Sequence, residues 1–429
     1  MRSFSQISSR FGPLSFYREA ITIALPVMLQ QLIMSMVSLI DNFMVAGLGD
    51  ISMAAVNVAN NINFIFIVII NTTCQAGGIY LAQFRGANDS DGMKHAFRFK
   101  VIFSLLAASL YFVLCRTIPH RMIAMMTMNN AAQEQIVAVG AGYLRLVSWT
   151  VFPMALSTSI GTSFREIAMP KWPLFVSVAA TLVNTAGNWI LIYGNLGAPR
   201  LEVSGAAYAT IVARIFEAAA FLVFAHVVKA PFSVGITRLF NIDRALIGRI
   251  LSKSAMIFIS ELSWVSSEMI MTAMYNRRGG AEVVAGMAAG WTIANIFFLL
   301  FGGIWTTAAV LVGGALGANK LDEARRRAQW LKSGSAAAGV IIAVPGAALS
   351  ALLIPLVFSN LSAAARTTSL GLVLVILVYL PLWGLLNVQF AISRAGGDTA
   401  LGMYTDVSVN TLLFVPGAII LSLATSISP

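Results

Sequence analysis

Seven ionisable residues inside long apolar stretches of the sequence are candidates for chemistry. A charged side chain in an apolar segment is costly, so each one is a candidate for function unless it pairs with an opposite charge. A carboxylate in such a place can bind a proton or a metal cation and later release it. The seven residues are Asp41, Arg145, Arg214, Glu217, Glu261, Glu268 and Asp406.

Asp41 and two asparagines could together hold a small cation. Asp41 follows Pro26 in the first apolar stretch, and Pro26 should kink that helix and free backbone carbonyls nearby. Asn184 and Asn188 are four residues apart, which puts both on one face of a helix. Carboxylate and carboxamide oxygens suit a hard cation such as Na⁺, and Thr210 could add a hydroxyl. The asparagines could equally donate hydrogen bonds to Asp41 or to a neighbouring helix.

Glu261 and Glu268 form a second candidate group. They are seven residues apart, so they project from nearly the same face of a helix. Trp264 lies on the next turn and could stack against an aromatic cation. We therefore predict that Trp264 and Glu268 line a substrate cavity beside Glu261. The alternative is that Glu261 forms a structural ion pair with Arg145 or Arg214.

The remaining polar residues give no sign of soluble-type catalysis. Arg214 and Glu217 are three residues apart, and we expect them to neutralise each other. The sequence contains no phosphate-binding loop, no dinucleotide-binding glycine motif and no HExxH motif. Cys74 and Cys115 both lie in apolar stretches and give no disulfide framework. We therefore predict a protein that is not an enzyme and that has no cofactor.

The composition identifies the class of protein that must position these residues. The 429-residue chain is 58% hydrophobic and only 10% charged, whereas a soluble chain is about 25% charged. This excludes a soluble enzyme, a nucleic-acid-binding protein and a disordered chain. The net charge of +11 is explained by Lys and Arg in cytoplasmic loops. We predict an all-α polytopic membrane protein with the lipid bilayer as a partner.

Eleven apolar stretches are long enough to cross a bilayer as helices. The alternating pattern of a membrane β-barrel is absent from the sequence. The stretches are residues 20–46, 52–84, 95–119, 135–162, 172–194, 203–228, 246–275, 283–316, 334–358, 367–392 and 401–426.

The distribution of Lys and Arg predicts the orientation. Most of them fall on the same side as the N-terminus, including Arg85, Lys94, Arg98 and Lys100, which we assign to the loop around the end of the second stretch and the start of the third. Such loops are cytoplasmic in most membrane proteins, so we place the N-terminus in the cytoplasm. Residues 1–19 lack the apolar core and cleavage site of a signal peptide.

The two halves of the sequence resemble each other. Gly-Ala-Asn-x-x-Asp occurs at residues 86–91 and again at residues 317–322, an offset of 231. Residues 229–245 form the longest polar interruption, so we place the boundary between an N-lobe, 1–230, and a C-lobe, 231–429. Six spans separate the two copies, which predicts a parallel repeat with the substrate site between the halves.

The repeat adds one candidate to the cavity and suggests one further match. Under the same offset, Gln30 corresponds to Glu261, so we include Gln30 among the cavity residues. A looser match pairs the stretch from Pro153 to Arg165 with the stretch from Pro381 to Arg394.

In their order and spacing, these motifs resemble those of the multidrug and toxic compound extrusion (MATE) transporters, over essentially the whole chain. The residues that carry the resemblance are Leu25-Pro26, Ile40-Asp41, the two Gly-Ala-Asn loops, Asn184, Asn188, Tyr193-Gly194, Ser204-Gly205-Ala206-Ala207 and Arg394-Ala395-Gly396-Gly397-Asp398.

The resemblance implies twelve helices in two six-helix lobes around a central cavity. It implies export of amphipathic organic cations in exchange for Na⁺ or H⁺ by rocking of the lobes. Asp41, Asn184, Asn188 and Thr210 match the N-lobe cation site, and Asn188 places the chain closer to the NorM-like branch. Glu261 matches the acidic residue that this branch uses in its C-lobe.

Two departures from the family pattern stand out, and an alternative function stays open. Residues 381–384 lack the acidic residue expected early in the tenth helix, and the sequence ends after the eleventh stretch. The alternative is a lipid-linked oligosaccharide flippase of the same superfamily. Acidic residues outnumber basic ones inside the spans, which favours a cationic cargo. We expect a monomer in the plasma membrane, which for a bacterium is the inner membrane.

Overall fold

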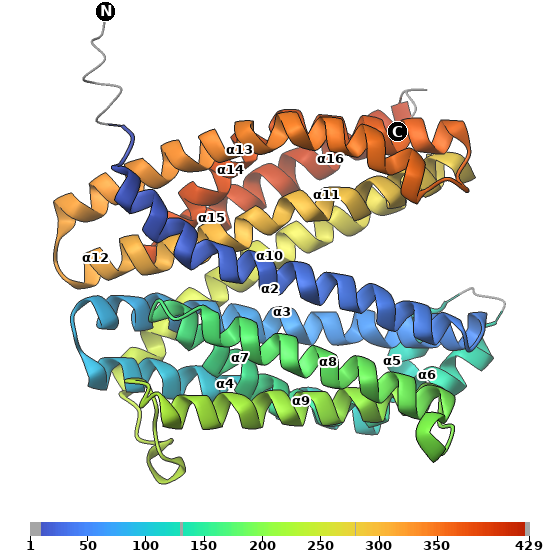
Figure 1. Ribbon diagram of the computed structural model, residues 1–429, viewed down its shortest axis with the longest axis horizontal. Coiled ribbons are helices and arrows are strands. Elements are labelled where there is room, and N and C mark those ends of the chain that lie inside the picture. The colour runs from blue at the N-terminus through green and yellow to red at the C-terminus, as the bar shows by residue number, and fades with distance from the viewer. Residues whose placement is uncertain (1–9, 129–131, 279, 425–429) are drawn as a thin grey trace, which may run out of the picture. The chain divides into compact units, whose positions relative to one another are not determined.

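The computed structural model describes residues 10–128, 132–278 and 280–424, and within these ranges the chain is helical without strands. Before the polar linker the α-helices are α2 (Leu14–Ala46), α3 (Asp50–Gly86), α4 (Ser90–Thr117), α5 (Pro119–Met126), α6 (Gln133–Val147), α7 (Val151–Glu166), α8 (Lys171–Tyr193) and α9 (Glu202–Val227). After it come α10 (Arg244–Arg278), α11 (Ala281–Ala308), α12 (Gly314–Gly317), α13 (Leu321–Val357), α14 (Ala363–Ala395), α15 (Ala400–Thr405) and α16 (Val415–Ala424) (Figure 1).

Short helical segments of other types join some of these helices into longer ones. A 3₁₀ turn, Ser148–Thr150, joins α6 to α7. Two π-helical segments, Ala309–Gly313 and Asp406–Phe414, join α11 to α12 and α15 to α16.

The helical membrane architecture predicted from the sequence is confirmed. Among the described residues, ten helices are long and apolar enough to cross a membrane. Helix α10 was expected as the seventh span, and it forms a 35-residue helix that is not one of these ten. Glu261, Glu268 and several serines interrupt its apolar sequence.

Contacts divide the chain into two compact units, which we call the N-terminal unit, Leu29–Ser254, and the C-terminal unit, Met1–Met28 with Ala255–Pro429. The division inside α2 falls two residues after Pro26. Proline has no backbone N–H and cannot bond to the carbonyl four residues earlier, so the helix is weakened close to this point.

The N-terminal unit is built on helices that pack along their lengths. Helices α8 and α9 pack together, as do α3 and α4, and α7 packs against both α4 and α9 (Figure 1). Aliphatic, small and aromatic side chains fill the centre, where the rings of Phe66 and Tyr111 stack at 4.7 Å. This core therefore fixes the positions of α8 and α9, which carry the predicted partners of Asp41.

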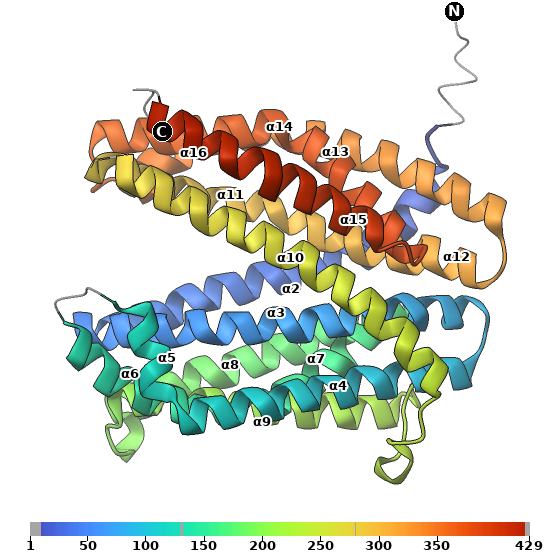
Figure 2. The same cartoon turned by 180° about the vertical axis from the view of Figure 1, so that it is seen from behind.

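The C-terminal unit has its own core between α11, α13 and α14. The part of α10 from Ala255 onward belongs to this unit, together with the segment α15–α16 (Figure 2). The start of α2 also belongs here. The hydroxyl of Tyr17 donates to the carbonyl of Trp330 at 3.1 Å, and a side chain at Gly303 would meet Ala24.

The sequence repeat is confirmed in the backbone. Helix α11 begins 231 residues after α3, and α13 begins 231 residues after α4. Asn88 and Asn319 both adopt left-handed conformations, with φ of 56° and 58°. The amides of Asp89 and Lys320 each donate to the carbonyl five residues earlier, at 2.9 and 3.0 Å. Both copies of the motif thus end their helices with the same Schellman turn.

The looser match is confirmed in the same way. Helices α7 and α14 end in matching turns, with left-handed backbone at Ala168 (φ 61°) and Gly397 (φ 84°). The amides of these two residues donate to the carbonyls of Arg165 and Arg394, at 3.0 and 2.8 Å. The two arginines are therefore structural equivalents.

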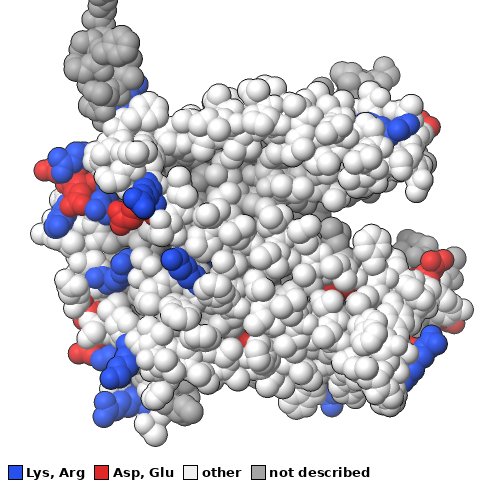
Figure 3. All heavy atoms as spheres, viewed as in Figure 1, with Lys and Arg blue, Asp and Glu red and all other residues white. Residues whose placement is uncertain are grey.

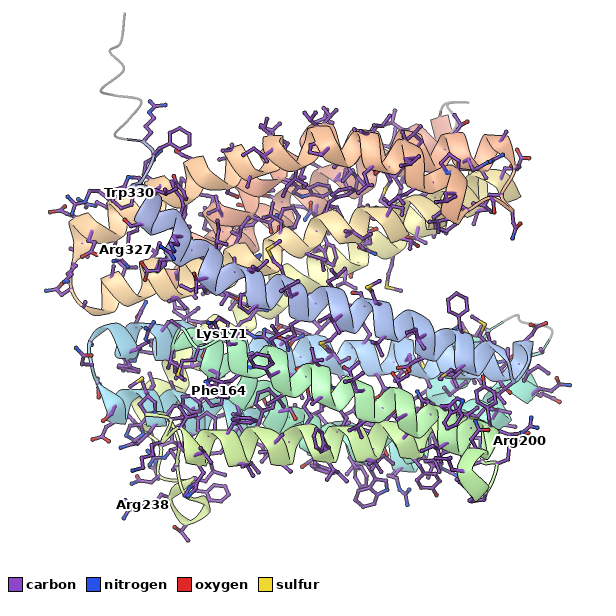
Figure 4. The ribbon with its side chains drawn as sticks, viewed as in Figure 1. Phe164, Lys171, Arg200, Arg238, Arg327 and Trp330 are labelled. Atoms are coloured by element: carbon purple, nitrogen blue, oxygen red, sulfur yellow. The ribbon has the colours of Figure 1, made fainter. Side chains whose placement is uncertain are left out.

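Charged side chains gather at the helix ends of each unit and are sparse along the helices on the face drawn in Figure 3. In the N-terminal unit, Lys171 and Arg238 lie at one end and Arg200 lies at the opposite end (Figure 4). Lys171 precedes the predicted span 172–194 and Arg238 follows the predicted span 203–228, so the sequence puts these two residues on one side of the membrane and Arg200, which lies between the spans, on the other. The helices of this unit are thus arranged as the loop pattern requires.

Candidate functional site

The structure brings together the four residues predicted for the N-lobe cation site. Asn188 on α8 donates from Nδ2 to Oδ1 of Asp41 on α2, at 2.9 Å, and to Oδ1 of Asn184 at 3.5 Å. Asn184 in turn donates from Nδ2 to the hydroxyl of Thr210 on α9, at 3.3 Å. The hydroxyl of Thr210 donates to the carbonyl of Ala206 at 2.9 Å. Three helices therefore contribute to one chain of hydrogen bonds that ends on a carboxylate.

One oxygen in this network has no partner. Asn188 is only 3% exposed, and its Oδ1 makes no hydrogen bond with any described residue. A buried acceptor without a donor is costly, and it needs an explanation such as a bound ion. The oxygens of Asp41, Asn184, Asn188 and Thr210 are suitable ligands for Na⁺, and the Asp41 carboxylate could instead bind a proton. The described residues contain no group of three His, Cys, Asp or Glu side chains that could hold a metal ion.

Glu261 lies in a different kind of environment. Arg394 on α14 donates from Nη1 to Oε1 of Glu261 on α10 at 3.2 Å, and it also donates from Nη2 to the hydroxyl of Ser260 at 3.4 Å. The guanidinium carbon lies 4.6 Å from the ring centre of Trp305 on α11. Trp305 is held by its indole N–H, which donates to Asn387 at 3.3 Å. Glu261 is thus a carboxylate that already has a cation.

The ion pair expected as the alternative for Glu261 is present with a different arginine. We expected Arg145 or Arg214 as the partner, and both are used otherwise. Arg145 is exposed, and Arg214 pairs with Glu217 at 2.8 Å, as its spacing predicted. The sequence-based choice of partner for Glu261 was therefore wrong, because linear spacing does not show which helices are neighbours.

The three cavity candidates, Gln30, Trp264 and Glu268, differ in burial and in hydrogen bonding. Gln30 is buried, and its amide donates to Ser177 at 2.7 Å; Ser177 donates to Glu217 at 3.2 Å. Trp264 is 50% exposed. Glu268 is half-buried and has no hydrogen-bond or ion-pair partner among the described residues. Gln30 therefore belongs to an internal network in the N-terminal unit, whereas the other two stand on α10 in the C-terminal unit.

Asp406 begins the π-helical segment and lies beside the Glu261 group. The hydroxyl of Ser260 donates to the Asp406 carboxylate, and the amide of Asn410 donates to it at 3.4 Å. π-Helical turns occur frequently at functional sites. Neither Arg394, Trp305 nor Ser260 was singled out as a site residue from the sequence, although the Arg394 turn was recognised as a motif.

A buried ion pair in the N-terminal unit was missed altogether. Lys100 on α4 is fully buried, and its Nζ donates to Oε2 of Glu166 at 2.8 Å and to the hydroxyl of Ser163 at 2.9 Å, both on α7. A side chain at Gly77 would come within 2.5 Å of Lys100, and one at Gly78 would collide with the Glu166 carboxylate. The paired glycines in an apolar stretch were the available sign of this close approach.

The assignment of Lys100 to a cytoplasmic loop was therefore wrong. Helix α4 begins at Ser90, so Lys100 lies almost three turns inside the helix. Arg98 was assigned to the same loop and is also buried, with Nη1 3.2 Å from Nδ1 of His95. Basic residues near the end of an apolar stretch look the same in the sequence whether they face water or a buried acid.

Comparisons with known proteins agree with this architecture. The sequence profile of the MatE family matches residues 26–190 and 257–420. The transporter YisQ of Bacillus subtilis is 24% identical over 71% of this chain and 66% of its own length. "Probable multidrug resistance protein NorM" of Bradyrhizobium diazoefficiens is 26% identical over 80% of this chain and 70% of its own length. The aligned part therefore spans about two thirds of these curated relatives.

A solved structure shows the same fold. It is described as the outward-facing conformation of a multidrug resistance MATE family transporter of the MOP superfamily. The TM-score is 0.82 at 16% identity, and the match covers 100% of this chain and 93% of the other. The family match covers most of the sequence in two segments that coincide with the two repeats. The chain therefore belongs to the MatE family, whose members are membrane transporters and not enzymes.

Proposed function

We propose that this protein is a secondary active exporter of amphipathic organic cations, driven by antiport of Na⁺ or H⁺. The observation that carries the proposal is the Asp41 network: among the described residues the carboxylate is bonded only to the carboxamide of Asn188, and the buried Oδ1 of Asn188 has no donor. The names of several relatives, which describe multidrug resistance proteins, support the class of cargo.

The coupling ion binds at Asp41 because its negative charge has no basic partner in the hydrogen-bonded network. Burial makes such a charge costly, so a proton or Na⁺ stabilises the carboxylate when it arrives from the side where the ion is concentrated. Asn184 and Thr210 orient Asn188, and Asn188 orients Asp41. Neutralising Asp41 removes its attraction for a cationic cargo, and this links entry of the ion to release of the cargo.

Alternating access follows from the repeat. Transporters with two parallel repeats bind substrate between the halves and expose it to each side in turn by rocking. The protein acts as a multi-pass monomer in the plasma membrane, with its N-terminus in the cytoplasm. The concentration of Lys and Arg in one set of loops supports this orientation.

A flippase for lipid-linked oligosaccharides would need unpaired positive charge for a pyrophosphate. The buried Lys100 and Arg394 and the half-buried Arg214 each lie within 3.2 Å of a carboxylate, whereas the buried Arg98 lies against His95. This pairing supports a cationic cargo over an anionic one.

The test is efflux of a fluorescent organic cation, ethidium, from proteoliposomes under an imposed pH gradient or an imposed Na⁺ gradient. We expect one gradient to drive efflux and Asp41→Asn to abolish it. Asp50→Asn, which changes an exposed acid at the start of α3, is the matched control and should transport normally. If neither gradient moves ethidium through the folded wild-type protein, the proposal is wrong, and lipid-linked substrates become the next choice.

A further inference from the structure

The C-terminal unit contains a cation-binding group that is filled by one of its own side chains. The Glu261 carboxylate and the Trp305 ring together contact the Arg394 guanidinium, at 3.2 Å and 4.6 Å. A carboxylate beside an aromatic face is the chemistry that recognises organic cations. We call Glu261 and Trp305 the cation box. The seated guanidinium shows that the box accepts a planar cation.

A second carboxylate lies close enough to take over the guanidinium. Ser260 connects the two acids, because it accepts a hydrogen bond from Arg394 at 3.4 Å and donates its own hydroxyl proton to Asp406. The Ser260 hydroxyl oxygen is thus bonded to both Arg394 and Asp406. The group as described thus has two carboxylates and one guanidinium, linked through a single serine.

This composition lets the box open at little electrostatic cost. A buried carboxylate that loses its only cation is strongly destabilised. If Arg394 moves from Glu261 to Asp406 while another cation enters the box, each of the two carboxylates has a positive partner. With Arg394 on Glu261 and the box closed, Asp406 has no positive partner in the part of the chain that the structure describes.

We propose that the cation box is a binding site for the cationic end of the cargo and that Arg394 is a tethered competitor, which moves to Asp406 when cargo binds. This inference rests on the proposed function, because it names the cargo subsite of the same transporter. The ligand class is a monovalent organic cation with planar, delocalised charge, since this most closely matches the guanidinium that the box already holds.

The simpler reading is that Arg394 only fastens α14 to α10. The two readings differ in what happens to binding when Arg394 is removed. A structural clamp would be lost with the arginine, and the site would bind cations no better or more weakly. A competitor, once removed, leaves the box empty for the cargo.

The experiment is equilibrium binding of ethidium to the purified full-length protein in lipid nanodiscs, followed by fluorescence at alkaline pH, where an unpaired carboxylate stays ionised. We expect Arg394→Gln to bind ethidium about tenfold more tightly than the wild type, which corresponds to about 1.4 kcal/mol. We expect Asp406→Asn to bind more weakly, because the guanidinium then has no second acceptor. Arg366→Gln, on the same helix α14, is the matched control and should leave the affinity unchanged.

A double variant tests the aromatic part of the box. In the single variant Trp305→Leu, the competitor and the cargo both lose the ring, so the effect on affinity is small. In Arg394→Gln/Trp305→Leu only the cargo loses it, and we expect the tenfold gain to disappear. Gel filtration and thermal unfolding show whether each variant is folded, and Arg394→Lys keeps the charge and should give an intermediate gain.

The inference is overturned if folded Arg394→Gln, or failing that folded Arg394→Lys, binds ethidium no more tightly than the wild type. It is also overturned if the double variant keeps the full gain. Failure of the proposed function would look different, because gradient-driven efflux would be absent in the wild type. A wild type that exports ethidium while Arg394→Gln shows no gain removes the inference and leaves the proposed function standing.

Discussion

The two units of this protein use related helices to surround their acidic residues in different ways. In the N-terminal unit, Asp41 is hydrogen-bonded to Asn188 and has no base in its network. In the C-terminal unit, Glu261 is bonded to Arg394, which also stacks on Trp305. The first carboxylate is available to an outside cation, and the second is available only after an internal cation leaves.

The difference arises from a few substitutions between repeats. Glu261 corresponds to Gln30, which is neutral and bonds to Ser177. Arg394 corresponds to Arg165, which stands next to Glu166. A repeat can thus conserve helix ends and turns while it redistributes charge, and the redistribution decides which unit carries which task.

We expect the largest effect, a loss of stability, at the buried ion pair between Lys100 and Glu166 in the N-terminal unit. Lys100→Met leaves Glu166 buried without its bonded base, and we expect a loss of about 3–5 kcal/mol in the free energy of unfolding. Lys100→Met/Glu166→Gln should recover much of it, because no charge is then left without a partner. Unfolding of the protein in detergent measures both.

The Lys100→Met variant also tests whether the two units surround their acidic residues differently. Lys94→Met removes an exposed ion pair with Asp91 and is the control, which we expect to change stability little. If Lys100→Met folds normally but abolishes ion coupling, then Lys100 takes part in coupling at Asp41. The N-terminal unit would then contain a basic residue that acts on its coupling carboxylate.

An intermediate effect is expected at Asn188. Asn188→Leu removes the hydrogen bond to Asp41, and a bond to a charged group contributes about 1.5–3 kcal/mol. If Na⁺ is the coupling ion, we expect its concentration at half-maximal efflux to rise about tenfold to hundredfold, because the Asn188 Oδ1 oxygen is lost with the side chain. If H⁺ is the coupling ion, we expect the required proton concentration to fall, because the lost bond stabilised the charged carboxylate. Asn60→Leu, at an exposed position of α3, should leave it unchanged. An unchanged ion dependence in Asn188→Leu would contradict the assignment of coupling to this network.

The smallest effect should come from the matching turns after α7 and α14. Ala168 holds a left-handed conformation that suits glycine, and its equivalent is Gly397. Relief of the Cβ strain should make Ala168→Gly more stable by about 1 kcal/mol, and Gly397→Ala should lose a similar amount. Thermal unfolding checks the signs. Equal signs for the two substitutions would show that the turns are not equivalent.

The sequence was informative where the signal is local. Apolar stretches predicted the helices, and the repeated Gly-Ala-Asn motif predicted two equivalent turns. The spacing of Asn184 and Asn188 predicted their shared face, and the family resemblance pointed to Asp41 as their neighbour.

Contacts between distant helices were harder to predict. Glu261 and Arg394 are 133 residues apart, and Lys100 and Glu166 are 66 residues apart. A single sequence shows several acidic and several basic residues, but it does not show which helices are neighbours in the fold. Lys100 therefore looked like a loop residue, and Glu261 was given the wrong arginines.

The placement of the first segment of α2 has a consequence for how the protein is made. Tyr17 bonds to Trp330, which is 313 residues further along the chain. At about 5–20 residues per second, the ribosome reaches Trp330 on the order of tens of seconds after Tyr17. During that interval the first turns of the protein have left the ribosome without the helices they will finally contact. Lipid or the insertion machinery must shelter them until the last third of the chain is synthesised.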